Sequence, residues 1–140
     1  MTNNEKIVRD FIAYFEKSWP DSFDEAMEFF AEDAWYQMVV PTIEPVRGKA
    51  AIREALEIMK TKVQDQKHDM LNVSASGNVV FTERCDHSLR HGKWVEVPLV
   101  AVFDLNDEGK ICGWREYLDM YNNLSQHGLS FEEMQKTVRK

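Results

Sequence analysis

The sequence predicts an α+β fold, built as a single domain over residues 1–140, because the hydrophobic period changes along the chain. The N-terminal part carries apolar residues at helical spacing, whereas the part after about residue 66 consists of strand-like segments separated by turn-forming clusters. Helices that precede a run of strands are typical of a sheet packed against helices. A chain of 140 residues is also long enough to bury one hydrophobic core.

Three helices are predicted first. The first should end near Trp19-Pro20, because proline cannot continue a helix. The second opens at Ser22, where Ser22 and Glu25 have the spacing of a capping box, and Gly48 introduces the third. The apolar positions of these helices are Ile7, Val8, Phe11, Ile12, Phe15, Phe23, Ala26, Met27, Phe30, Ile52, Ala55, Leu56, Met59 and Val63.

Strands are predicted on both sides of the third helix. The segment 34–40 is aromatic and β-branched and is followed by Pro41 and Pro45, so it reads as a short strand. Four longer strands follow as an antiparallel meander, with glycine in each intervening turn. Their expected ranges are 68–75, 79–89, 93–105 and 111–121.

Two local signals refine this plan. Pro98 interrupts the third strand of the meander, so a bulge or an unpaired edge is expected there. Ser130 and Glu133 have capping-box spacing and predict a terminal helix.

Apolar side chains occur at both parities of the long strands, which is typical of a sheet buried on two faces. Helices would cover the concave face, and a second copy of the chain would cover the convex face. The expected partner is therefore an identical chain in a homodimer. The apolar strand residues are Val79, Phe81, Trp94, Val97, Leu99, Val100, Val102, Phe103 and Trp114.

Charge and composition argue against several other partners. The net charge is -7 and Lys and Arg are not clustered, so neither nucleic acid nor an anionic membrane surface is an expected partner. No apolar run is long enough to span a bilayer and the N-terminus lacks a signal pattern, so a cytoplasmic location is expected. The four histidines lack metal-ligand spacing, and no metal site is expected.

The candidate site consists of charges at strand spacing. Arg84 and Asp86 are two residues apart and project to one face of a strand, where they could meet Glu116 from another strand. Two carboxylates that share one guanidinium in an apolar cavity cannot titrate alike. One of them would carry a proton and the other would stay ionised. The alternative is that these charges form a structural ion pair without a catalytic role.

Apolar residues at the same strand parity as Glu116 would form the wall around it. By alternation these are Cys112, Trp114 and Leu118, and Cys85 would face the opposite way from Arg84, which excludes a disulfide between the two cysteines. Tyr36 lies on the short first strand and Met38 follows it at the same parity, so Met38 is a further candidate for contact with a small hydrophobic substrate.

Several segments together resemble the limonene epoxide hydrolases. The similarity runs from about residue 6 to residue 121, and its most specific parts are the string TERCD at 82–86 and the string WREY at 114–117. The resemblance implies the nuclear transport factor 2-like (cystatin-like, SnoaL-like) fold, in which a cone-shaped, curved antiparallel or mixed sheet wraps around three N-terminal helices.

The resemblance also implies a metal-free, cofactor-free hydrolysis in one acid–base step, and the expected substrate is a small hydrophobic epoxide, terpenoid or cyclic. It assigns Asp86 as the general acid, Glu116 as the base, Arg84 as the bridge between them and Tyr36 as a group that positions water. Two departures stand out, because the family has aspartate in place of Glu116 and asparagine in place of Met38. The alternatives are a SnoaL-like polyketide cyclase, a ketosteroid-isomerase-like proton-transfer enzyme, or a non-catalytic protein that binds a hydrophobic ligand.

Overall fold

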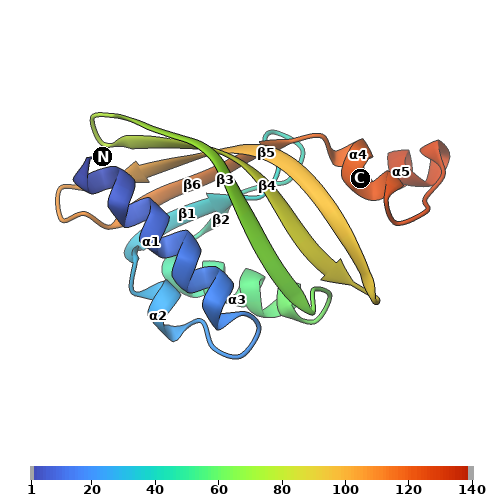
Figure 1. Ribbon diagram of the computed structural model, residues 1–140, viewed down its shortest axis with the longest axis horizontal. Coiled ribbons are helices and arrows are strands. Elements are labelled where there is room, and N and C mark those ends of the chain that lie inside the picture. The colour runs from blue at the N-terminus through green and yellow to red at the C-terminus, as the bar shows by residue number, and fades with distance from the viewer. Residues whose placement is uncertain (1, 139–140) are drawn as a thin grey trace.

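The computed structural model describes residues 2–138, which form helices and one six-stranded sheet. In chain order the elements are α1 (Asn3–Ser18), α2 (Asp24–Met27), β1 (Phe30–Gln37), β2 (Val46–Arg47), α3 (Lys49–Lys60), β3 (Asp65–Ser76), β4 (Val79–Arg90), β5 (Lys93–Leu105), β6 (Ile111–Leu118), α4 (Met120–Ser125) and α5 (Phe131–Val138). Figure 1 shows the long strands curving together, with the first three helices on their inner side.

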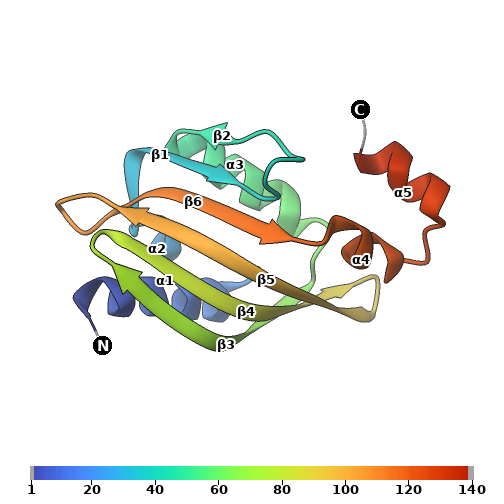
Figure 2. The same ribbon diagram turned by 90° about the horizontal axis from the view of Figure 1, so that it is seen from above.

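The sheet is mixed, curved and open. Its strand order is β2-β1-β6-β5-β4-β3, and all neighbours are antiparallel except β1 and β6. Strands β3 to β6 form the predicted antiparallel meander, and β2 and β3 are the two edges (Figure 2). The predicted α+β architecture is therefore confirmed.

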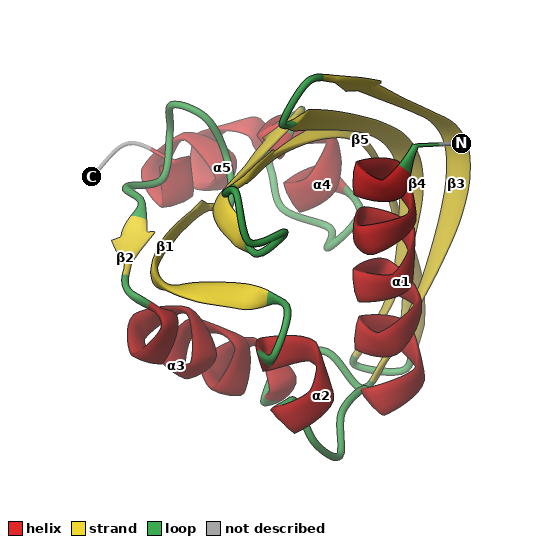
Figure 3. Ribbon diagram, turned by 90° about the vertical axis from the view of Figure 1, so that its left-hand side faces the viewer, coloured by secondary structure: helices red, strands yellow, loops and turns green. Residues whose placement is uncertain are grey.

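The helices close the concave side of the sheet. Figure 3 shows α1 beside β3 and β4, and α3 beside β1, with α2 between the two helices. The apolar faces predicted for α1 and α3 are buried there, including Phe11, Phe15, Ile52 and Leu56. Within the described residues, no helix is both long and apolar enough to cross a membrane.

The second helix differs from its prediction. It is a single turn that starts after Phe23, and no side chain caps it, because Ser22 Oγ accepts a hydrogen bond from Asp24 N instead of forming a capping box with Glu25. Phe30 belongs to β1, which begins four residues before the predicted strand. The sheet supplies the reason, since the backbone N–H of Ile111 in β6 already bonds to the chain at Phe29.

Other local predictions are confirmed. Pro98 pairs with Cys85 of β4 without a register shift, and β5 pairs with β6 only from Leu99 onward. Pro98 therefore lies at an unpaired edge, where a missing N–H leaves no partner unsatisfied. Both arms of the capping box between Ser130 and Glu133 are formed.

A β-bulge in β6 overturns one prediction. Ile111 pairs with Leu105 and Gly113 pairs with Asp104, so Cys112 is an extra residue that has no partner across the ladder. The bulge reverses the alternation of side chains, and the thiol of Cys112 points away from Glu116 and bonds to the Asp104 carbonyl at 3.4 Å. The prediction that Cys112 shares a face with Glu116 was wrong, although both cysteines are free.

Candidate active site

Strand β4 places a row of polar side chains on the concave face. Because side chains alternate along a strand, Thr82, Arg84, Asp86, Ser88 and Arg90 all share the parity that faces the helices. Among these, the side chain of Arg84 is only 3% exposed, so its charge has to be compensated locally.

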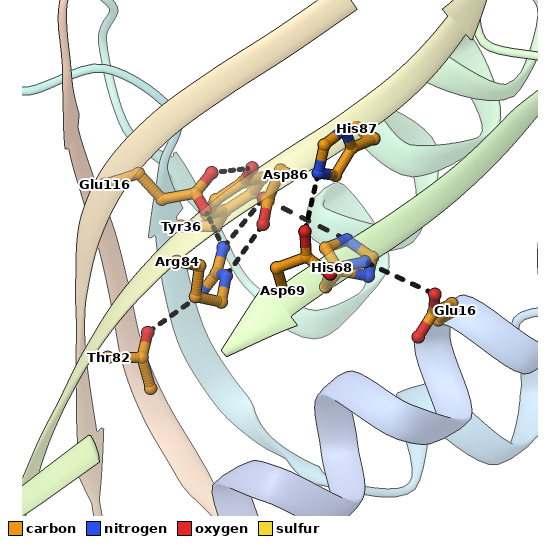
Figure 4. Close-up of polar contacts among 9 residues, drawn as sticks. All are labelled: Glu16, Tyr36, His68, Asp69, Thr82, Arg84, Asp86, His87 and Glu116. Atoms are coloured by element: carbon orange, nitrogen blue, oxygen red, sulfur yellow. Dashed lines mark hydrogen bonds and ion pairs between the residues drawn. The ribbon is translucent and has the colours of Figure 1, made fainter. Parts of the chain in front are cut away.

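The guanidinium of Arg84 bridges two carboxylates, as the strand spacing predicted (Figure 4). Its Nε and Nη2 donate to the two oxygens of Asp86, each at 3.0 Å. Nη2 also donates to Glu116 Oε2 at 2.9 Å, and Nη1 donates to Thr82 Oγ1 at 2.9 Å. Burial alone would lower the pKa of Arg84, but the two carboxylates raise it overall, so the guanidinium stays charged.

Glu116 is the more deeply buried of the two carboxyl groups. Its side chain is 10% exposed, against 19% for Asp86. Its second oxygen, Oε1, accepts a hydrogen bond of 2.8 Å from the Tyr36 hydroxyl, and the Tyr36 ring stacks on Trp114 at 3.8 Å between centroids. Burial raises the pKa of Glu116, and Asp86 adds to the rise while Arg84 opposes it. Burial, followed by the charge of Glu116, also raises the pKa of Tyr36.

These groups line a cavity of about 380 Å³ between the sheet and the helices. Of the predicted substrate contacts, Met38, Trp114 and Leu118 line the cavity and Cys112 does not. The remaining lining is mostly apolar, with Phe11, Ile12, Phe15, Val39, Ile43, Ala55, Leu56, Ile58, Met59, Val97 and Leu99 among its members. The charged network thus lies in one wall of a largely apolar chamber.

His68 is a site residue that the sequence analysis did not select. It lines the cavity from β3, with a side chain that is 5% exposed, and its Nε2 lies 4.0 Å from Asp86 Oδ2. Its Nδ1 is buried and has no hydrogen-bond partner among the described residues. Burial lowers the pKa of His68, so the ring is neutral at pH 7.

The position of His68 depends on a second bulge. From the β3–β4 turn to Asn72 the pairing of β3 with β4 is regular. Leu71 is then an extra residue without a partner on β4. Because of this bulge, His68 rather than Asp69 lies opposite Asp86. Alternation along β3 could have identified His68 as inward-facing only if this bulge had been known. His87, on the other side of the sheet, pairs with Asp69 at 2.8 Å and does not line the cavity.

The arrangement suits acid–base chemistry. Burial raises the pKa of Glu116 and the charge of Asp86 adds to the rise, so this carboxyl keeps its proton to higher pH than an exposed glutamate does. One member can then give a proton while the other takes one. Within residues 2–138, no three His, Cys, Asp or Glu side chains are grouped so as to hold a metal ion.

Comparison with known proteins also indicates an epoxide hydrolase family. Residues 2–128 match the family model described as the limonene-1,2-epoxide hydrolase catalytic domain. An epoxide hydrolase of Mycobacterium tuberculosis, described as similar to the limonene enzymes, has a TM-score of 0.74 at 24% identity, with 87% of this chain and 86% of that chain covered.

Two further solved structures have the same fold. An epoxide hydrolase/cyclase-like enzyme, SalBIII, has a TM-score of 0.75 at 23% identity, with 85% of this chain and 92% of that chain covered. A SnoaL-like polyketide cyclase from Shewanella putrefaciens has a TM-score of 0.77 at 14% identity, with 90% and 96% covered. At these identities the structures show the fold alone, which is the nuclear transport factor 2-like, SnoaL-like fold. Because the family model spans nearly the whole chain, the protein belongs to the limonene-1,2-epoxide hydrolase family.

Proposed function

We propose that the protein is a cofactor-independent epoxide hydrolase that adds water to a hydrophobic epoxide. The observation that carries the proposal is the bridge from Arg84 to both Asp86 and Glu116 in the wall of an apolar cavity. Opening an epoxide needs a proton for the departing oxygen and a base for the attacking water, and two carboxyl groups with different environments provide both.

We assign the proton to Glu116. Its carboxyl is the more buried of the two, and this burial raises its pKa; it also accepts only one hydrogen bond from Arg84, whereas both oxygens of Asp86 accept from Arg84. Glu116 therefore protonates the epoxide oxygen, and Asp86 accepts the proton of the attacking water. This order is the reverse of the one that the family resemblance implies.

The two departures from the family pattern support this reversal. The longer side chain of Glu116 bonds directly to the Tyr36 hydroxyl, so these two groups satisfy each other instead of both turning to a water molecule. Met38 offers no amide beside them. On the opposite side, His68 Nε2 and Asp86 Oδ2 are 4.0 Å apart, a separation at which both can bind one water molecule.

Attack by water and opening of the epoxide ring then occur in one step. The water oxygen bonds to an epoxide carbon and passes a proton to Asp86, while the carbon–oxygen bond of the epoxide breaks and its oxygen takes the proton of Glu116. The product is a vicinal diol. Arg84 remains bonded to both carboxyl groups, and its charge stabilises whichever of them is ionised.

Turnover in oxygen-18 water tests the proposal directly. Limonene oxide, cyclohexene oxide and a set of linear epoxides would be incubated with the protein, and the diols would be quantified by mass spectrometry. The expected result is one labelled oxygen per diol, and at least about a hundredfold loss of kcat in both Asp86→Asn and Glu116→Gln. No diol above the uncatalysed rate across the whole set would overturn the proposal.

A further inference from the structure

A second hollow lies at one end of the cavity, and its charged side chains are all basic. It lies between the turn that joins β4 to β5 and the chain that follows α4. Its basic lining residues, called the basic rim here, are Lys62, Arg90, His91, Lys93 and His127, of which His127 has a pKa lowered by burial and by the neighbouring Arg90. The other lining residues are apolar or uncharged, so no carboxylate lines the hollow within the described chain.

The basic rim gathers three Lys and Arg side chains, Lys62, Arg90 and Lys93, in a chain whose net charge is -7. Elsewhere several basic side chains form ion pairs with an acidic neighbour, among them Lys6, Arg53 and Arg115. Neither Lys62 nor Arg90 has an ion-pair or hydrogen-bond partner for its side chain among residues 2–138. Lys93 reaches only a backbone carbonyl, that of Gln126.

Arg90 is the side chain in the basic rim that most needs a partner. It is half-buried, and its Nε is shielded from solvent without a hydrogen-bond acceptor in the part of the chain that the structure describes. Burial lowers the pKa of Arg90, which shows that the guanidinium is partly desolvated. A buried donor without an acceptor is unfavourable, so a bound anion would be stabilised here.

The basic rim adjoins the cavity, because the two hollows share lining residues. Lys62 and Arg90 line both of them. Arg90 follows Asp86 by four residues on the same face of β4, so their Cα atoms are about 13 Å apart along the strand. A ligand that places an anionic group on the basic rim can therefore extend an apolar chain past Met59 and Leu99 to the carboxylates.

From this geometry we infer that the basic rim binds the carboxylate of an amphipathic substrate, in which an apolar chain joins the carboxylate to the reacting group. The substrate class is then a long-chain epoxy acid rather than a neutral cyclic epoxide. The identity of the reacting group rests on the proposed function, whereas binding of the carboxylate does not. A carboxylate fits the planar, bidentate donor pattern of Arg90, and Lys62 adds a second charge.

Binding without turnover tests the basic rim independently of the chemistry. Calorimetry on the full chain would compare a saturated long-chain fatty acid, which has no epoxide, with its methyl ester. The acid should bind at least about tenfold more tightly, and added salt should narrow the difference. Equal affinities for acid and ester would overturn the inference.

Variants locate the effect. Arg90→Gln and Lys62→Gln should each remove most of the preference for the acid, whereas Arg90→Lys should retain part of it because the charge is kept. Arg9→Gln on the exposed face of α1 removes the same charge far from the hollow and should leave the preference unchanged. Thermal unfolding midpoints within a few degrees of the wild type would exclude a folding defect, and loss of the preference in Arg9→Gln would contradict the assignment.

Kinetics with a long-chain epoxy acid and its methyl ester separates the two proposals. The acid should have the lower KM, and Arg90→Gln should raise KM for the acid with little change in kcat. If neither epoxide is hydrolysed but the saturated acid still binds through Arg90, epoxide hydrolysis fails and the carboxylate site stands. If an alkyl phosphate binds through Arg90 and the fatty acid does not, the carboxylate assignment is overturned.

Discussion

Glu116 and His68 are the two side chains on which the proposed reversal of catalytic roles depends. The side chain of Glu116 is one methylene longer than that of aspartate, and its carboxyl group accepts hydrogen bonds from both Arg84 and Tyr36. His68 brings a neutral ring to the other side of the cavity, beside Asp86. In the proposed mechanism these two residues decide which carboxyl group meets water, and each leads to a separate prediction.

His68 is expected to position the attacking water. His68→Leu removes both ring nitrogens and should lower kcat by roughly ten- to a hundredfold, since misplacing a reactant by about 1 Å has effects of this size. His68→Gln keeps a polar atom and should recover part of the loss. The pH profile separates this role from a structural one, because only the acid limb should change, where the wild-type ring becomes protonated. An unchanged acid limb in both variants would contradict the role.

The pKa of Glu116 links this residue to stability. Burial raises its pKa in the folded protein above the ordinary value near 4.5, so the folded state holds a proton that the unfolded state has already released. Its contribution is therefore fully present below pH 4.5 and is lost as the pH rises through the elevated pKa.

Glu116→Gln removes this titration while keeping the shape of the side chain. The free energy of unfolding of the variant, relative to the wild type, should therefore improve as the pH is raised from 4 to 8. Urea unfolding at a series of pH values measures the difference. Glu32→Gln, a change at an exposed carboxylate of β1, is the matched control and should show no such trend. A constant difference for Glu116→Gln would refute the assigned direction.

Among the secondary-structure elements, β6 owes the orientation of its side chains to its bulge. Gly113 follows the extra residue and lies against the neighbouring strands, where an added Cβ would be 2.6 Å from Asp104 Oδ2 and 2.9 Å from Trp35 Nε1. Gly113 does not have a positive φ, so its backbone conformation does not require glycine. Glycine is required here because there is no space for a Cβ atom. The same bulge turns Trp114 and Glu116 toward the cavity.

Gly113→Ala should lower the free energy of unfolding by about 1–3 kcal/mol, the usual effect of overpacking. Cys112→Ala is the matched control one residue away. It should cost less than about 1 kcal/mol, because it removes only a weak S–H hydrogen bond, and it should leave diol formation unchanged. Denaturant titration and the oxygen-18 assay check both values. Equal stability of Gly113→Ala and the wild type would show that the contact relaxes freely.

In the molecule as a whole, the convex face of the sheet remains uncovered. Helices shield the concave face, but large apolar side chains on the convex face stay open to solvent, among them Phe81 and Tyr117, at 42% and 44% exposure. Val100 lies directly opposite Tyr117 and is 39% exposed. Exposed large apolar side chains that share one face of a sheet are typical of a protein interface, and we propose that a second copy of the chain covers this face.

Sedimentation at micromolar concentration should therefore give the mass of a dimer. Val100→Glu would place a charge at the centre of the proposed interface and should shift the protein to a monomer. Tyr14→Glu introduces the same charge on an exposed residue of α1, away from this face, and should leave the mass unchanged. A wild-type monomer under these conditions would refute the proposed homodimer.

Much of this molecule follows from local rules. Helical spacing identified α1 and α3, glycine-containing turns separated β3 to β6, and a spacing of two placed Arg84 and Asp86 on one face, because these patterns depend on backbone geometry that is the same in every protein. The approach of Glu116 to Arg84 was also foreseen, since both lie on buried strands of one sheet.

The features that the sequence did not predict depend on the pairing of distant segments. A bulge at Leu71 decides that His68 lies opposite Asp86, and a bulge at Cys112 turns that thiol out of the cavity. Lys62 and Arg90 come together only because the chain after α3 passes the end of β4. A bulge shifts side-chain parity by one residue and is decided by the packing of both strands, so no pattern within one segment specifies it.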